Sequence, residues 1–98
     1  MPATACVIQD KLHLNKNVYT IDLRHGCTGF VYGLSIAKGL ITSGQVKNVL
    51  LFTVDIPTII LHPDDLELRM IFGDASVVTL LTNDDNSNSE IGEFVFGT

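Results

Sequence analysis

Residues 19–41 read Tyr19-Thr-Ile-Asp-Leu-Arg-His-Gly-Cys27-Thr-Gly-Phe-Val-Tyr-Gly-Leu-Ser-Ile-Ala-Lys-Gly-Leu-Ile41, a β-prone run followed by a long apolar run. The β-branched and aromatic residues from Val18 to Leu23 predict a strand. The run from about Cys27 to Ser43 is apolar on nearly every side, which predicts a buried helix, and Gly44 suits the position that ends it. The pattern therefore places Cys27 in the first turn of a helix that follows a strand.

Cys27 is the candidate catalytic residue. The N-terminal end of a helix carries a partial positive charge and unpaired N–H groups, and both favour the thiolate form of a cysteine. The thiolate is the form that acts as a nucleophile. The alternative is that Cys27 is a small buried hydrophobic residue, as free cysteines commonly are.

The rest of the chain alternates between helical and β-prone segments. Residues 3–13 predict a helix with one apolar face, and residues 47–54 predict a strand covered on both faces, as in a parallel sheet. Residues 55–69 predict a long loop with one helical turn. Residues 75–82 predict another buried strand, which forms a hairpin with a last strand at 91–96 across a polar turn. The order α-β-α-β-β-β predicts a three-layer α/β fold with a partial mixed sheet, in which ligands bind beyond the carboxyl ends of strands.

The length and net charge of the chain indicate a single domain that binds neither nucleic acid nor membranes. The chain has 98 residues, enough for a single domain, and its net charge of −5 with scattered basic residues argues against nucleic acid as a partner. No run reaches the roughly 18 apolar residues of a membrane span, so we expect no membrane association. Two cysteines, with neither a disulfide framework nor metal-type spacing, indicate a reducing cytoplasm and no metal. Of the two, Cys6 is expected in the core of the first helix.

The chain resembles the β-ketoacyl-acyl-carrier-protein synthase III group of the thiolase-like superfamily. Three segments carry the resemblance in the family's order: Pro2-Ala-Thr-Ala-Cys-Val-Ile-Gln9; Asp22 through Cys27-Thr-Gly-Phe-Val-Tyr-Gly-Leu34 to Ser43-Gly44; and Lys47-Asn-Val-Leu-Leu51 followed by Phe72-Gly-Asp74. The resemblance covers nearly the whole chain. It implies a three-layer α/β/α thiolase-like fold in which residues 1–98 form a single partial domain, an internal fragment from the later part of the N-terminal half.

The family's reaction implies a role for Cys27. Family members transfer an acyl group from an acyl-CoA primer onto an active cysteine and condense it with a malonyl group on acyl carrier protein, with loss of CO₂, in fatty-acid or polyketide-type biosynthesis. The resemblance assigns Cys27 as that cysteine and its backbone N–H to an oxyanion hole, with no cofactor. The family's catalytic His and Asn lie in its second half and match none of His13, His25 and His62. These residues alone should therefore be inactive or nearly so.

The resemblance also implies a homodimer. In the family, the strand that corresponds to residues 18–23 lies at a sheet edge and pairs with its twin, and exposed edges readily add partners. The cysteine-bearing helix packs against its counterpart from the second half through a face of small residues. Gly29, Gly33 and Ala37 supply that face here, so the resemblance implies that it is bare or covered by another chain. The residues alone leave an alternative open, in which this stripe of small residues packs tightly against the chain's own sheet.

Two stretches depart from the family pattern and leave the acyl chain length open. Arg24-His25 replace small residues before the cysteine, and Ala75-Ser76-Val77-Val78 replace a glycine-rich run after Asp74. Asp74 itself is expected to order a turn, and Asp64-Asp65 to begin a helix.

Two other functions stay open. One is a non-catalytic α/β association module. The other is a thiol-dependent acyl hydrolase that uses Cys27 and His25, although side chains two residues apart usually point apart.

Overall fold

The computed structural model describes residues 2–84 and 89–97. Its elements, in chain order, are α1 (Thr4–Lys11), α2 (Gly29–Thr42), β1 (Asn48–Asp55), the 3₁₀ turn η1 (Pro57–Ile59), α3 (Leu66–Ile71) and β2 (Ala75–Thr82). The helices predicted at 3–13 and 27–43 are therefore present with slightly shorter bounds. Gly44 follows α2 with a φ of 73°, which confirms its predicted role at the helix end.

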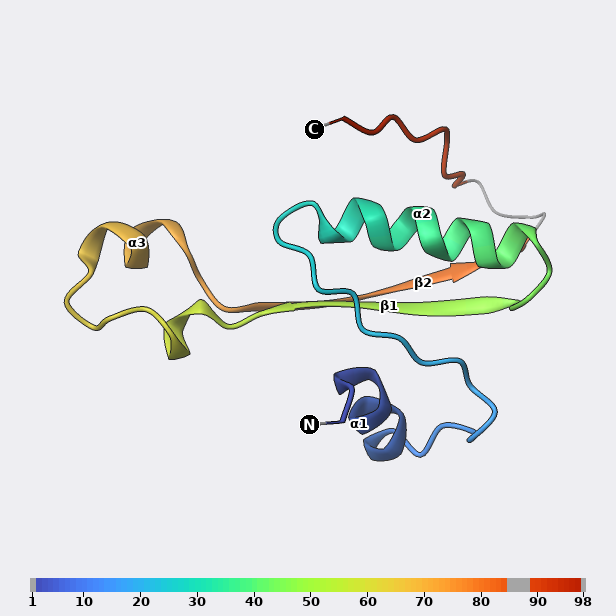
Figure 1. Cartoon of the computed structure of the whole chain (residues 1–98), viewed down its shortest axis with the longest axis horizontal. Helices are drawn as coiled ribbons and strands as arrows, with labels where there is room; N and C mark the ends of the chain where they lie inside the picture. Colours follow the sequence, from blue (N-terminus) through green and yellow to red (C-terminus); the bar gives the residue numbers. More distant parts are fainter. Residues whose placement is uncertain (1, 85–88, 98) are drawn as a thin grey trace.

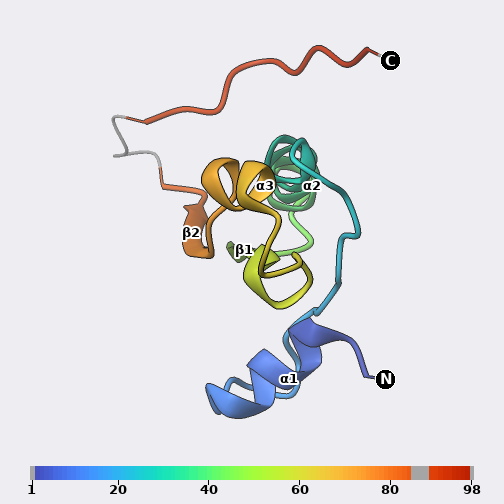
Figure 2. The same cartoon turned by 90° about the vertical axis from the view of Figure 1, so that its left-hand side faces the viewer.

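The two strands form an antiparallel sheet. Their register runs from Asn48 opposite Thr82 to Asp55 opposite Ala75. The prediction of a parallel environment for residues 47–54 is therefore wrong among the described residues, because the neighbour of β1 is β2, which returns after η1 and α3. Helix α2 lies along one face of the sheet, and α1 lies beyond the opposite side (Figures 1 and 2).

The core lies between α2 and the sheet. Ala37 of α2 and Leu81 of β2 are buried, with 2% and 6% of their surface exposed, and Gly33 is buried as well. A Cβ atom on Gly33 would lie 2.8 Å from a terminal methyl of Leu51, so the missing side chain lets α2 approach β1. Gly33 and Ala37 therefore do not form a bare face. The expectation that they await another half or another chain is wrong, and the alternative, packing against the chain's own sheet, is confirmed.

Residues 18–23 do not form the predicted strand. Tyr19, Ile21 and Leu23 are exposed, and the backbone of residues 19–24 makes no hydrogen bond with other backbone groups of the described residues. A strand is stabilised by pairing with a neighbour. β-prone composition alone is therefore not enough, and this segment follows an irregular path from α1 to α2 (Figure 1).

The C-terminal segment also differs from the prediction. Residues 91–96 form no strand, and the expected hairpin with residues 75–82 is absent: β2 pairs with β1 along one edge, and residues 91–96 do not pair with its other edge. The segment returns along the outer side of α2 (Figure 1), where the Lys38 amino group donates hydrogen bonds to the carbonyls of Ile91 and Gly92 at 2.6 and 2.9 Å. Of the polar turn predicted between the two, residues 85–88 lie outside the described residues.

Helix α1 is held by the segment that follows it. Its N-cap residue, Ala3, provides no side-chain cap. The Asp22 carboxylate supplies one from a distance, since it accepts hydrogen bonds from the backbone N–H groups of Thr4 at 2.6 Å and Ala5 at 2.8 Å. The Cys6 thiol lies 3.3 Å from the Thr20 hydroxyl. Cys6 is thus exposed and not in the core, because α1 has no buried residue.

Replacing Asp22 by asparagine should weaken the hydrogen bonds that the Thr4 and Ala5 amides donate at the N-terminus of α1. The Ala5 and Thr4 amides lower the pKa of Asp22, so its contribution to stability is complete above the usual carboxyl value of about 3.9 and is lost as the pH falls through the lower folded-state value. Hydrogen exchange of these two amides, followed from neutral to acidic pH, measures the effect. The protection factor of each amide, which is its exchange rate compared with that of an unstructured peptide at the same pH, should fall with acid in the wild type and be low at every pH in Asp22→Asn. Asp10→Asn, the same charge change on α1, is the control; equal protection in both variants would contradict the prediction.

Candidate active site

Cys27 lies in the turn that leads directly into α2. The turn is closed by a hydrogen bond from the Gly29 N–H to the Gly26 carbonyl at 2.7 Å, and the thiol is exposed. Thr28 is the N-cap of α2 and makes no side-chain capping bond. The thiol is thus accessible, and the prediction that Cys27 sits at the beginning of this helix differs from the structure by two residues.

The surroundings of Cys27 have two further properties. Among residues 2–84 and 89–97, no hydrogen bond uses the Cys27 amide, so this donor is available to a ligand. The N-terminal end of α2 points toward the end of the sheet where β1 finishes (Figure 1). Residues 18–23 form no strand, so Cys27 does not follow the carboxyl end of one. The N-terminus of α2 and the carboxyl end of β1 nevertheless lie at the same end of the sheet, which is where ligands bind in α/β folds.

His25 contacts the turn and α2. Its Nδ1 lies 2.9 Å from the Thr28 hydroxyl, and its ring stacks on Tyr32 with 4.4 Å between ring centroids. Within the described residues no hydrogen bond joins His25 to Cys27. The arrangement required for a Cys27–His25 hydrolase is therefore not formed here.

The other acidic and histidine candidates have structural contacts. Asp74 accepts hydrogen bonds from the Thr58 backbone N–H at 3.1 Å and the Thr58 hydroxyl at 2.6 Å, which confirms its expected role in ordering a turn. Asp65 caps α3 by accepting from the Leu68 N–H at 3.1 Å, as expected for a helix start. His62 lies 3.8 Å from Asp64, and both are solvated. None of these residues is brought to Cys27.

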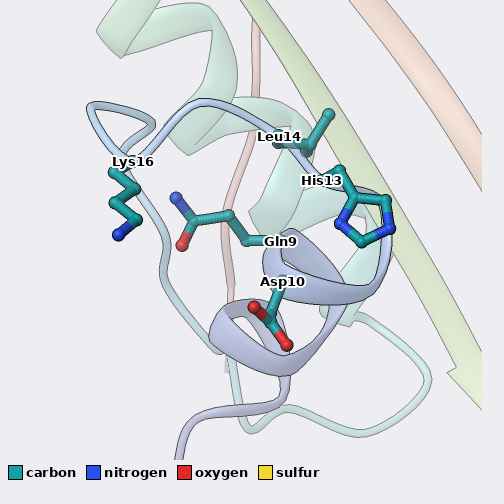
Figure 3. Close-up of a pocket in the computed structure, with 5 residues that line it drawn as sticks. All are labelled: Gln9, Asp10, His13, Leu14 and Lys16. Atoms are coloured by element: carbon teal, nitrogen blue, oxygen red, sulfur yellow. The ribbon is translucent and has the colours of Figure 1, made fainter.

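A shallow hollow of about 330 Å³ lies beside α1. It is lined by Gln9, Asp10, His13, Leu14 and Lys16, with the Gln9 side chain extending toward Lys16 and His13 on the other side of Gln9 (Figure 3). The Gln9 amide also donates to the Asn15 carbonyl at 2.8 Å, which makes it part of the turn after α1. This hollow is far from α2 along the chain and on the other side of the sheet (Figure 1), so it does not belong to the Cys27 site.

The described residues hold neither a metal centre nor a membrane span. No three His, Cys, Asp or Glu side chains among residues 2–84 and 89–97 come together in a way that would hold a metal ion. No helix in this part of the chain has the length and apolar character needed to cross a membrane.

Known proteins match both the sequence and the structure. The model of the 3-oxoacyl-[acyl-carrier-protein] synthase III family matches residues 21–98. The chain belongs to this family. A β-ketoacyl-[acyl-carrier-protein] synthase III of Clostridium perfringens is 39% identical over 82 residues, which are 84% of this chain and 25% of that protein. The corresponding protein of Aliarcobacter butzleri is 41% identical over 90 residues, or 90% of this chain and 27% of the relative.

Solved structures of the family show the same fold. A crystal structure of a 3-oxoacyl-(acyl-carrier-protein) synthase III superposes with a TM-score of 0.92 at 41% identity, covering all of this chain and 29% of that one. A second, from Burkholderia xenovorans, gives a TM-score of 0.79 at 35% identity over 86% of this chain and 24% of the other. The α/β fold is therefore thiolase-like, and the resemblance inferred from the three sequence segments is confirmed. The chain spans about a quarter of the length of the curated relatives it matches.

Sequence reasoning missed one cluster near the site. Lys38 reaches across α2 to the C-terminal segment, where its amino group lies 6.0 Å from the centre of the Phe94 ring, and Phe96 packs on Tyr32 with 5.3 Å between centroids. The sequence does contain one clue to this cluster. Lys38 is the charged residue in the largely apolar helix α2, and a charged group in such surroundings needs hydrogen-bond acceptors nearby. The position of those acceptors, in residues 91 and 92, could not be read from the sequence.

Proposed function

We propose that this chain carries the acyl-accepting cysteine of a 3-oxoacyl-acyl-carrier-protein synthase III, and that Cys27 is that residue. The observation that carries the proposal is the position of Cys27, exposed in the turn directly before α2 in a chain of this family. Peptide dipoles at a helix N-terminus favour the anionic, nucleophilic form of a nearby thiol. The unused Cys27 amide supports a second role, donation to the oxygen of the reacting carbonyl.

The proposed step is a thioester exchange. The Cys27 sulfur attacks the carbonyl carbon of an acyl-CoA; the new carbon–sulfur bond forms as the bond to the CoA sulfur breaks. CoA leaves as a thiolate and takes up the proton that Cys27 has lost. The acyl group is then condensed with a malonyl group on acyl carrier protein, with loss of CO₂, in fatty-acid biosynthesis. That second step needs positioned acid–base groups, which we assign to a His and an Asn in a longer protein that includes these residues.

The first step, the transfer of the acyl group to Cys27, can be measured on the chain itself, although we expect the complete condensation to be absent from these residues alone. After incubation with acetyl-CoA, peptide mass spectrometry should find acetyl on Cys27 and far less on Cys6, the other exposed free thiol. Equal labelling of the two cysteines, or none, would contradict acyl transfer by this chain and favour the association module. Rapid hydrolysis of acetyl-CoA that is lost in His25→Ala would instead favour the hydrolase.

We also propose that the protein acts as a cytoplasmic homodimer. Two free cysteines suit a reducing compartment. The chain exposes 8355 Å² of surface, whereas a compact monomer of its mass exposes about 5,500 Å². Segment 19–24 combines exposed apolar side chains with backbone groups that no described backbone group engages, so it can add a strand from a second copy.

Sedimentation analysis tests the dimer. The wild type should sediment as a dimer at high concentration, and Ile21→Glu should shift it toward monomer, because the new charge would be buried where the copies pair. Leu66→Glu, at an exposed leucine of α3, is the matched control and should leave the dimer intact. A wild type that remains monomeric at high concentration would refute the dimer, and dissociation by both variants alike would refute pairing through segment 19–24.

A further inference from the structure

We infer that His25 is a positioning residue that fixes the turn carrying Cys27; the inference rests on the proposed acyl transfer to that cysteine. His25 and Thr28 flank Cys27 in the sequence, and their side chains meet across the turn at 2.9 Å. When the imidazole proton is on Nε2, the Thr28 hydroxyl donates to Nδ1. The bond therefore holds the backbone on both sides of Cys27.

Backbone contacts tighten the same turn. The Gly29 N–H donates to the Gly26 carbonyl at 2.7 Å. A Cβ atom on Gly29 would lie only 3.3 Å from the Cβ of His25, so the missing side chain lets His25 fold back onto the start of α2. Two links therefore span Cys27, one between the side chains of His25 and Thr28 and one between backbone atoms of Gly26 and Gly29, and together they fix the backbone from which its side chain projects.

His25 is in turn anchored by a column of rings. Its imidazole stacks on Tyr32 with 4.4 Å between centroids and 20° between planes, and Phe96 lies on Tyr32 at 5.3 Å. Phe94 stacks on Phe96 at 6.0 Å. This column joins the turn to the C-terminal segment, which Lys38 fastens to α2 through the carbonyls of residues 91 and 92. The imidazole is therefore braced by an element far from it in the sequence.

The contacts assign His25 a geometric role. Its Nδ1 is engaged by Thr28, and no hydrogen bond connects it with Cys27 among the described residues, so it is not placed to accept the thiol proton. A positioned nucleophile reacts faster because less orientation has to be achieved in the transition state. We expect the loss of the His25–Thr28 bond to slow acyl transfer. The transfer needs the Cys27 sulfur and the Cys27 amide N–H to reach the same carbonyl group, the sulfur at its carbon and the N–H at its oxygen.

Three variants separate the parts of this arrangement. His25→Phe keeps a ring for Tyr32 and removes the Nδ1 atom; Thr28→Val removes the hydroxyl at nearly constant shape; Thr28→Ser keeps the hydroxyl. Acetyl transfer from acetyl-CoA to Cys27 should fall about fivefold in His25→Phe and in Thr28→Val, the effect of one ordinary hydrogen bond. The double variant, which combines His25→Phe with Thr28→Val, should be no slower than either single variant, because both substitutions remove the same hydrogen bond. Thr28→Ser should keep the wild-type rate. The far-UV circular dichroism spectrum should be the same in the wild type and all variants, which controls for general unfolding.

The outcomes distinguish this inference from the proposed function. If the wild type acetylates Cys27 and His25→Phe is as fast, or Thr28→Ser is as slow as Thr28→Val, the positioning role is overturned and the acyl transfer stands. If the wild type transfers no acetyl group, the acyl transfer fails, and hydrogen exchange of the Gly29 amide decides the rest. Faster exchange in His25→Phe and Thr28→Val, with protection kept in Thr28→Ser, supports positioning of the turn; equal exchange in all variants overturns it.

Discussion

Cys27→Ser should lower acetyl transfer from acetyl-CoA by about 10³-fold or more, as removal of a covalent nucleophile does in other enzymes. The reason is chemical, because a serine hydroxyl in the same turn is a much weaker nucleophile than a thiolate at neutral pH. The substitution changes one exposed atom, so the fold should be unaffected. Intact-mass spectrometry of the acetylated chain over time gives the rate.

Cys6→Ser is the matched control for this experiment. Both cysteines are exposed and free, but Cys6 lies on α1, where its thiol contacts Thr20. The control should keep the wild-type rate. Cys6 also lies in the first turn of a helix, but its amide donates to the Ala3 carbonyl at 3.1 Å and is not available to the oxygen of a reacting carbonyl, as the Cys27 amide is. A Cys27→Ser chain that still acquires acetyl at the wild-type rate, with the label on Cys6 or a lysine, would show that the transfer is nonspecific and would remove the basis of the proposed function.

Gly33→Val should lower the free energy of unfolding by about 2 kcal/mol relative to Gly39→Val, because it overfills a packed interface. A Cβ on Gly33 would lie 2.8 and 3.1 Å from the two terminal methyls of Leu51, so this side chain has to shift within the interface to admit it, and the two further carbons of valine add to the crowding. Thermal unfolding followed by circular dichroism should show Tm lowered by roughly 10 °C, the scale expected for a domain of this size.

Two further variants make this prediction specific. Gly39→Val introduces the same side chain into the same helix, but nothing lies within 4 Å of a Cβ there, so it reports only the helix propensity. Leu51→Ala creates space opposite Gly33, and combining it with Gly33→Val should recover part of the lost stability. Equal Tm values for the two glycine variants, or strict additivity in the double variant, would show that the Gly33–Leu51 contact does not limit the approach of α2 to β1.

Local chemistry was enough for the elements that depend on their own residues. The apolar run ending at Gly44 predicted α2, because a helix satisfies its backbone internally. Asp65 was recognised as a helix start, and Cys27 was placed within two residues of its position before α2. Each of these features depends on neighbours close in sequence, so a single chain is sufficient to indicate them.

The sheet and its neighbours could not be predicted in the same way. β-prone composition predicted strands at 18–23 and 91–96, but a strand requires a partner, and the partner of β1 proved to be β2. The small residues of α2 were compatible with contact to another chain or to the chain's own sheet, and the structure decides for the sheet, since Gly33 meets Leu51 and Ala37 is buried. Which face of an apolar helix is covered depends on where distant segments return, and periodicity does not contain that information.

The sequence by itself determined the family, through three segments that resemble it, and the helix that follows Cys27, because these depend on residue types and on neighbours close in the chain. It also supplied the thiol that we propose as the nucleophile. Tertiary structure alone decided the antiparallel register, the face of α2 against the sheet, and the contacts of His25 with Thr28 and Tyr32. Phe96 reaches Tyr32 only because the C-terminal segment returns along α2, where Lys38 binds it. The physical reason is that hydrogen-bond ladders, close helix–sheet approach and ring stacking join residues far apart in the chain, and their geometry exists only once those segments have come together.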